Sequence, residues 1–316
     1  MYGNATLDDG ALPIAPSRSG AAWLRLPARL LSAISSNRKA VFGLLILGVF
    51  TVMAIFAPLI APYNPHGTDF LPSATPSRDH LLGTTSYGQD ILSQVIWGAR
   101  QTLIIGSLAG LAATLLSVLV GVTAAYLGGI ADHILSVVVD IFLVIPALPL
   151  MIIIAAYAKG GGMWVLIGVI AVTGWSFGAR QIRPQALSLR NRDFLESARV
   201  RGESSFYIIL FELLPNMISL TVAIFLGAAL YAVLAAAGLQ FIGLGNADEI
   251  SWGTMLYWGE NNEALMTGSP LWIMIPGACI ALLGASVALI NYAVDELGNP
   301  SLRVARRKRG RRAPRA

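Results

Sequence analysis

The chain of 316 residues has little charge, because Asp, Glu, Lys and Arg together make up only 12% of it. This is about half the share that is usual in soluble domains. Hydrophobic residues make up 55% of the chain. The scarcity of charged side chains argues against a soluble globular protein and favours one that exposes most of its surface to lipid.

Residues and motifs that commonly form catalytic, metal-binding or nucleotide-binding sites are also scarce. Cys279 is the single cysteine, which excludes an intrachain disulfide and a thiolate metal cluster. The three histidines, His66, His80 and His133, lie in or beside predicted loops and show no metal-ligand spacing. The phosphate-binding pattern G-x-x-x-x-G-K-[ST] is missing, so we do not expect this chain to be an ATP-driven motor. We expect no catalytic residue, bound cofactor or metal in this chain.

Long uncharged runs are what the chain has in abundance. Five runs contain no Asp, Glu, Lys or Arg, and a sixth is interrupted only by Asp140. About 20 apolar residues cross the hydrocarbon core of a bilayer, and each run supplies about that number. The pattern predicts an all-α membrane protein with six transmembrane helices, near residues 41–61, 101–127, 134–157, 163–181, 217–237 and 271–294.

Basic residues are concentrated in three segments. The segment before the first span holds five Lys or Arg, the segment 180–216 holds six, and the tail after the last span holds eight. Because cytoplasmic loops carry an excess of Lys and Arg, this distribution predicts that both termini and the loop 182–216 are cytoplasmic. The remaining basic residues are then on the opposite side: Arg78, Arg100 and Lys159.

The predicted organisation has three parts. Residues 1–38 are expected to form a disordered cytoplasmic arm, residues 39–303 a six-helix membrane domain, and residues 304–316 a basic cytoplasmic tail. A basic tail beside a final span faces anionic lipid headgroups, so we interpret it as a topology anchor rather than a nucleic-acid site.

Three polar or small-residue features lie inside predicted spans. Asp140 is either a buried polar tie between helices or part of the wall of a pathway. The segment 174–178 reads Gly-Trp-Ser-Phe-Gly, the pattern of a hydrolase nucleophile elbow. That elbow requires a strand-to-helix turn, whereas this segment is predicted to be helical, so we favour an ordinary membrane helix. Gly106 and Gly110 form a small-xxx-small pair, which predicts close helix packing.

The predicted cytoplasmic loop contains signals for a short helix. Asp193 is a suitable N-cap, and Glu196 then falls at position N3, where a capping box is possible. Gly202 stands where a helix ends in a left-handed residue. We predict a helix over residues 194–201, and a second helix that starts at Ser204 or Ser205 and leads to Pro215 at the beginning of the fifth span.

The predicted loop 238–270 on the opposite side is acidic and contains no Lys or Arg. We predict a short interfacial helix near residues 252–261. Two interpretations stay open, namely a docking surface for an extracytoplasmic partner and an acidic solvated loop with interfacial aromatic residues. The acidic residues are Asp248, Glu249, Glu260 and Glu263, and the aromatic residues are Trp252, Tyr257 and Trp258.

The cytoplasmic loop resembles the E-A-A-x3-G-x9-I-x-L-P loop of ABC-importer permeases. The matching residues are Glu196, Ala198, Gly202, Leu214 and Pro215. Two positions depart from the pattern, because Ser197 replaces an alanine and Glu212 replaces an isoleucine.

Further segments resemble the C-type permease subunit of dipeptide and oligopeptide importers, so that the resemblance covers about residues 40–303. Thr85 and Gln89 depart from that family's pattern. The matching segments are His80-Leu81-Leu82-Gly83-Thr84, Gly88, Asp90, Ser93, Gly98, Arg100, Leu103, Asp140 with Pro146, Trp175, Ala179-Arg180, Arg183, 241–245, 251–256, Pro276-Gly277 and Asn299-Pro300 with Leu302-Arg303.

This resemblance implies a type I ABC-importer permease-like bundle in a bacterial cytoplasmic membrane. It implies a homologous second permease, two ATPase subunits that use ATP and Mg, and an extracytoplasmic peptide-binding protein, with no nucleic-acid partner. The residues implied to couple the chain to the ATPases are Asp193, Glu196, Ala198, Arg199, Arg201, Gly202, Leu214 and Pro215, with Arg199 and Arg201 as direct contacts.

Alternatives to a peptide importer stay open at this point. Relatives of this branch also carry nickel, glutathione or other small solutes, and the chain shows no local pocket signature that separates these substrates. An ATP-independent channel is a different class of function, and a membrane hydrolase that uses Ser176 is the least favoured.

Overall fold

The computed structural model describes residues 37–158 and 162–298. The predictions for the amino-terminal arm, Lys159, the Asn299-Pro300 motif and the basic tail lie outside the described residues. The described part is helical, and its only β pairing is an isolated bridge between Thr84 and Asp90.

Five helices are long and apolar enough to cross a membrane, which confirms the predicted helical membrane fold. A bent pair of helices supplies a sixth possible span. The five are α2 (Arg38–Ile55), α4 (Ile91–Leu127), α7 (Gly162–Arg190), the continuous helix Ser205–Phe241, which ends in α10 (Ile218–Phe241), and α12 (Leu271–Gly298).

The predicted third span is not one straight helix. It consists of α5 (Gly129–Val144) and α6 (Ala147–Tyr157), which meet at an angle of 87°. Pro146 causes this break, because a residue that precedes proline is pushed out of the helical region. Ile145 is accordingly extended, with φ −67° and ψ 126°. A second break, at Phe56, divides the first predicted span into α2 and α3 (Ala57–Ile60), with Pro58 in the first turn of α3.

Two helices are longer than the sequence predicts. α4 begins ten residues before the predicted residue 101, because the Asp90 side chain accepts a hydrogen bond from the Ser93 backbone N–H at 2.8 Å and caps the helix. α7 continues past the predicted residue 181 to Arg190. The first part of the predicted loop 182–216 is therefore helical, because charge marks where a span leaves lipid and not where its hydrogen bonds end.

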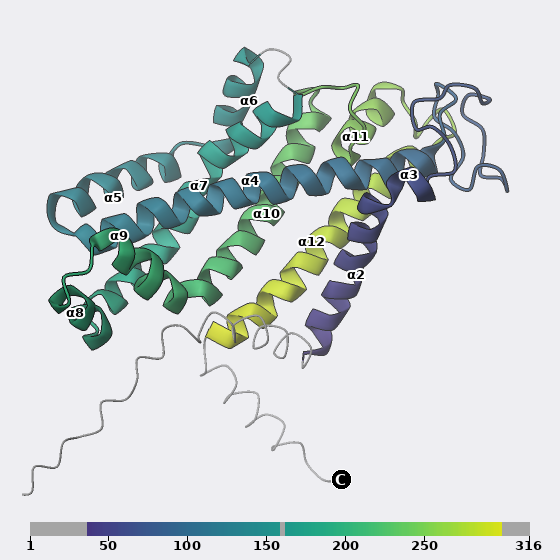
Figure 1. The fold of residues 1–316 in the computed structure, drawn as a ribbon. Coiled ribbons are helices and arrows are strands. Elements are labelled where there is room, and N and C mark those ends of the chain that lie inside the picture. Colours follow the sequence, from purple (N-terminus) through teal and green to yellow (C-terminus); the bar gives the residue numbers. More distant parts are fainter. Residues whose placement is uncertain (1–36, 159–161, 299–316) are drawn as a thin grey trace, which may run out of the picture.

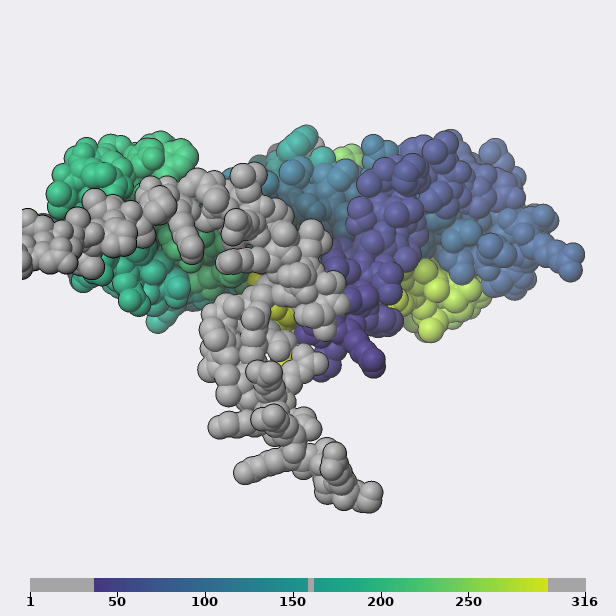
Figure 2. Space-filling model, turned by 60° about the horizontal axis from the view of Figure 1, so that its bottom comes forward, coloured from purple at the N-terminus to yellow at the C-terminus, as the bar shows by residue number. Residues whose placement is uncertain are grey.

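α4 lies across the molecule and packs against α7 and α10 (Figure 1). The predicted close approach at the small residues is confirmed, since a Cβ added to Gly110 would lie 2.6 Å from the Ala229 Cα of α10. The start of α2 and the end of α12 lie at one side of the bundle, whereas α3 and α11 (Trp252–Asn261) lie at the other. Figure 2 shows an elongated molecule in which the segments around residue 200 and residues 61–90 lie at opposite extremes.

Candidate functional site

The most distinctive projection of the molecule is the α8 knob, which we define as residues 193–217. It comprises α8 (Asp193–Val200), α9 (Ser205–Tyr207), the π-helical turn η1 (Ile208–Leu213) and the 3-10 turn η2 (Leu214–Met217). Leu195 and Ala198 on the inner face of α8 are fully buried. They belong to one apolar cluster with Val122 and Tyr126 of α4, Ile182 and Ala186 of α7, and Ile208 and Leu213 of η1.

The beginning of α8 differs from the prediction. Arg192 is the N-cap, Asp193 is the first helical residue, and no side chain caps the helix. The capping box is therefore wrong. The extended backbone of Arg192 places its carbonyl to accept from the N–H groups of Leu195, at 2.9 Å, and Glu196, at 3.2 Å. Asp193 and Glu196 still lie in the first turn, where the helix dipole favours negative charge.

The end of α8 is a Schellman turn, as the position of Gly202 predicts. Gly202 has φ +79°, its N–H donates to the Arg199 carbonyl at 3.0 Å, and the Glu203 N–H donates to the Ala198 carbonyl at 3.2 Å. A Cβ added to Gly202 would meet no atom within 4 Å. The glycine is therefore required by backbone conformation and not by space.

The second helix of the knob starts at Ser204, whose hydroxyl accepts from the Tyr207 N–H at 3.2 Å. This confirms the predicted start. The helix passes through η1 and η2 into α10 without ending. Pro215 lies in η2, at the junction with the span, and Leu214 packs at the edge of the knob's apolar cluster. Because proline has no N–H to donate, the irregular turns occur here.

The two arginines expected to contact a partner both make contacts within the chain. The Arg201 guanidinium pairs with Glu203 at 2.8 Å and with Glu212 at 3.6 Å, and the Glu203 carboxylate raises the pKa of Arg201 above its usual value. Arg199 lies over the Tyr126 ring at 5.4 Å. Arg199 also donates to the Arg190 carbonyl at 3.2 Å. Glu212 thus serves as a brace between α8 and η1.

The sequence did not predict that the knob exposes large apolar side chains, of which Val200 and Phe206 are the most exposed. Val200 is 83% exposed and Phe206 is 72% exposed, and they flank Gly202. Both side chains lie on the outer side of the knob and are available for contact with a partner protein. The sequence offers one indication of this exposure, because Val200 and Phe206 are the only large apolar residues in the polar segment 199–206.

The structure does not bury Asp140. Its side chain is 62% exposed, and its carboxylate lies 3.5 Å from the Arg180 guanidinium on α7. The interpretation as a buried tie is therefore wrong, although an exposed ion pair between α5 and α7 exists. A stronger pair nearby was missed, because Arg183 donates to both carboxylate oxygens of Asp132 at 2.7 Å.

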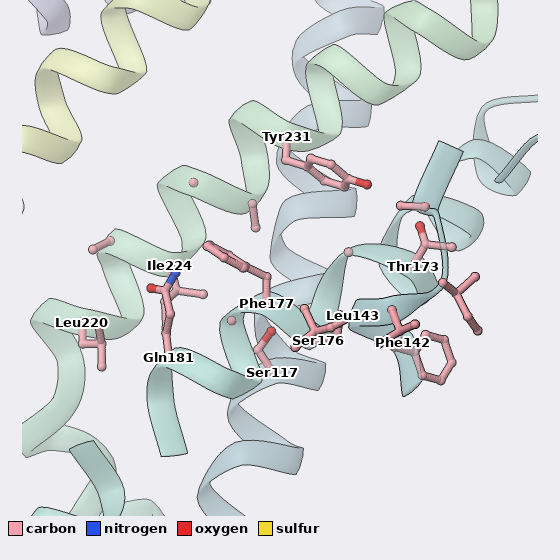
Figure 3. A pocket seen from close by; sticks show the side chains of 18 of the residues that line it. Ser117, Phe142, Leu143, Thr173, Ser176, Phe177, Gln181, Leu220, Ile224 and Tyr231 are labelled. Atoms are coloured by element: carbon pink, nitrogen blue, oxygen red, sulfur yellow. The ribbon is translucent and has the colours of Figure 1, made fainter. Parts of the chain in front are cut away.

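A cavity of about 720 Å³ lies elsewhere, on the side of α7 that faces α10 (Figure 3). Its walls come from α4, the α5–α6 bend, α7, α10 and α12. Ser176 lines it from within α7, so the strand-to-helix geometry of a hydrolase elbow is absent at this serine. Asp140 does not line this cavity but a smaller one of about 300 Å³ between α4, α5 and α7.

At the opposite end, α11 spans Trp252–Asn261, as predicted. Ser251 and Thr254 form a capping box at its start. Trp252 is fully buried and donates from Nε1 to the Val95 carbonyl at 3.0 Å, so it is a core residue and not an interfacial anchor. Tyr257 and Trp258 are partly exposed and stack edge to face with ring centroids 5.2 Å apart.

Comparison with known proteins identifies two matching families. The family described as "Binding-protein-dependent transport system inner membrane component" matches residues 117–297. The family described as "N-terminal TM domain of oligopeptide transport permease C" matches residues 30–76.

Curated relatives cover most of the chain. It is 32% identical to the oligopeptide transport system permease protein OppC of Mycobacterium tuberculosis over 277 residues, which are 86% of this chain and 93% of the relative. It is 30% identical to a putative peptide permease protein of Brucella suis, over 85% of this chain and 88% of that protein. It is 29% identical to the dipeptide transport system permease protein DppC of Bacillus subtilis, over 89% and 85% respectively.

Proposed function

The chain belongs to the family of inner membrane components of binding-protein-dependent transport systems, and we propose that it is a permease subunit of an ATP-driven peptide importer. The observation that carries the proposal is the α8 knob, which combines a buried inner face with an exposed outer face at one end of a membrane bundle. The names of its relatives support a peptide as the substrate.

The α8 end of the bundle is proposed to be cytoplasmic. Six arginines lie at that end, from Arg180 to Arg201, and the start of α2 adds Arg38 and Lys39. The opposite end carries Arg78 and Arg100 among its described residues. This asymmetry follows the positive-inside tendency and would place both termini in the cytoplasm.

The exposed face of the knob is proposed to receive an ATPase subunit. Val200 and Phe206 would provide apolar anchors, and Glu196 a polar contact at the rim. Because Arg199 contacts both Tyr126 of α4 and Arg190 of α7, a movement of α8 would be transmitted to the two helices that form the centre of the bundle. ATP and Mg would be bound by the ATPase and not by this chain.

A homologous second permease is proposed to cover the cavity side of the molecule. Several large apolar residues of α5 and α7 are exposed in the single chain, among them Ile141, Val144 and Phe177. Such a surface requires lipid or another membrane subunit. The cavity would then form half of a translocation path between two subunits.

Single cysteines test the orientation and the coupling together. Val200→Cys, in a Cys279→Ala background, is expected to resist a membrane-impermeant maleimide in intact cells and to crosslink to an ATP-hydrolysing subunit. The matched control is Met266→Cys at the other end, which is 86% exposed and is expected to react from outside. Labelling of Val200→Cys from outside, or crosslinks only to other proteins, would contradict the proposal.

Substrate class is tested with the co-purified assembly in lipid vesicles. Peptide together with its binding protein should stimulate ATP hydrolysis and drive uptake. Uptake that continues when ATP hydrolysis is blocked would indicate a channel, and stimulation by nickel or glutathione but not by peptides would reassign the substrate.

A further inference from the structure

We propose that the cavity of about 720 Å³ holds the main chain of a passing peptide through four uncharged side chains, Ser176, Gln181, Tyr231 and Asn291. The inference rests on the proposed function and deepens it, because it names the part of the substrate that this subunit recognises. In Figure 3, Ser176 and Gln181 project from α7 and Tyr231 from α10, and all three line the cavity. Asn291 lines the same cavity from α12.

The first support is that all four side chains lack a hydrogen-bond partner within the described part of the chain. Ser176 is buried, and the Asn291 Oδ1 atom is shielded from solvent and accepts no hydrogen bond. Buried polar atoms are almost always paired, so the unpaired Asn291 Oδ1 atom indicates a missing partner. Gln181 and Tyr231 are exposed in the single chain, so their polar groups are available to a ligand in the cavity. Two other hydroxyls in the wall differ, because Ser117 donates to the Trp175 carbonyl at 2.6 Å and Thr173 to the Val169 carbonyl at 2.8 Å.

The second support is the absence of charge. Among the described residues that line the cavity there is no Asp, Glu, Lys, Arg or His. The ion pair of Asp140 with Arg180 lines the smaller cavity on another side of α7. Charged termini or side chains of a substrate therefore find no counter-ion here, whereas a carboxamide both donates and accepts and so matches a peptide group in either direction.

The third support is size and apolar lining. Ligand cavities commonly measure about 300–1,000 Å³ and combine apolar walls with a few placed polar groups. Phe142, Leu143 and Ile224 provide the apolar wall here. Such walls accept side chains of varied shape without reading their charge. The predicted consequence is a path that is selective for the peptide backbone and tolerant of side chains.

The main experiment introduces charge into the neutral cavity. Asn291→Asp and Gln181→Glu are each compared with Gln185→Glu, a matched control one turn along α7 that does not line this cavity. The measured quantity is the ratio of ATP-driven uptake of Ala-Lys-Ala to that of Ala-Glu-Ala, at saturating binding protein, in vesicles containing the whole assembly. Because both rates come from one preparation, differences in folding or yield cancel.

We expect a unit negative charge added to this uncharged cavity to shift the ratio at least about tenfold towards Ala-Lys-Ala in both cavity variants. The control should keep the wild-type ratio. A ratio within about twofold of wild type in both cavity variants would overturn the inference, as would an equal shift in Gln185→Glu.

A second measurement tests main-chain recognition directly. An analogue of Ala-Ala-Ala in which an ester oxygen replaces an amide N–H removes one donor while keeping the side chains. The wild-type assembly should import the ester more slowly than the peptide at saturating binding protein, and Asn291→Ala should reduce that difference. An ester imported as fast as the peptide by the wild-type assembly would contradict recognition of the main chain.

The two levels of the proposal fail in different ways. If the wild-type assembly shows no ATP-driven uptake of either peptide, the proposed function is wrong. If wild-type uptake is normal but the charge ratios and the ester difference do not respond to the substitutions, only the role of this cavity is wrong.

Discussion

α8 and α11 are two short helices at opposite ends of the same bundle, and they are held in different ways. α11 has a reciprocal capping box at its start and a fully buried tryptophan in its first turn. α8 has no side-chain cap and is held by two buried residues, a Schellman turn and the contacts of Arg199. Most of the surface of α8 is therefore left free for another protein.

We interpret this difference as follows: α11 is fixed to the bundle, whereas α8 can be moved by a partner protein. The Trp252 ring contacts Phe50 of α2 edge to face, with centroids 5.1 Å apart, and its backbone N–H donates to Thr102 of α4 at 3.2 Å. α11 is thereby locked to two spans. α8 instead lies on the ends of α4 and α7, so that a push on its exposed face moves those helices as units.

The comparison predicts its largest effect at Trp252. Trp252→Ala should destabilise the protein by about 3–5 kcal/mol, because it removes a fully buried aromatic side chain and leaves a cavity. Thermal unfolding of the purified assembly measures this loss. Trp164→Ala, at a position that is exposed on α7, is the matched control and should unfold near the wild-type temperature. Equal unfolding temperatures for the two variants would show that α11 is not locked.

Ala198 offers the corresponding test in α8. Ala198→Leu places three extra carbons in a fully buried site, which should cost about 1–3 kcal/mol. The strain can be relieved if α8 moves away from the ends of α4 and α7. We therefore expect a clear loss of ATP-driven uptake with only a small fall in the unfolding temperature. The control is Ser197→Leu on the exposed side of the same helix, with uptake and ATP hydrolysis measured in parallel. If Ala198→Leu showed wild-type uptake and a wild-type ratio of uptake to ATP hydrolysis, the buried inner face of α8 would not be needed for coupling.

Local signals predicted much of these two helices and of the spans. The uncharged runs required helices, because no other backbone arrangement of such length satisfies its hydrogen bonds in lipid. Gly202 predicted the end of α8, because a left-handed residue is needed there, and Ser204 predicted the next start. These features depend on residues that are close together in the chain.

Features that depend on distant packing could not be predicted in this way. Trp252 looks like an interfacial aromatic in sequence, and its burial depends on α2 and α4. The polar residues of the cavity stand singly in separate apolar runs, and the α5–α6 bend and the rotation of each helix bring Gln181 and Asn291 to one space. The prediction ended the fourth span near the first arginine, which is too early, because Arg183 and Arg190 belong to the same helix.

Gly202 tests whether the shape of the α8 turn matters apart from its packing. Gly202→Val should cost about 1–2 kcal/mol locally, because a left-handed conformation is unfavourable for L-residues and worse for a branched one. We expect ATP hydrolysis to become uncoupled from uptake. Gly202→Asn tolerates the same conformation and is the matched control. No atom lies near the added Cβ, so a defect in both variants would indicate lost partner contact rather than backbone strain.

The smallest effects are expected at the two acidic residues of α5. Asp132→Asn should cost about 1 kcal/mol, because it breaks a bidentate, partly buried pair with Arg183. Asp140→Asn should change stability by less than about 0.5 kcal/mol, because its pair with Arg180 is long and exposed. Uptake by Asp140→Asn should match that of Asp248→Asn, an exposed position at the other end of the bundle. If Asp140→Asn alone abolished uptake while unfolding at the wild-type temperature, Asp140 would act in transport, and the path would have to include the smaller cavity beside α7.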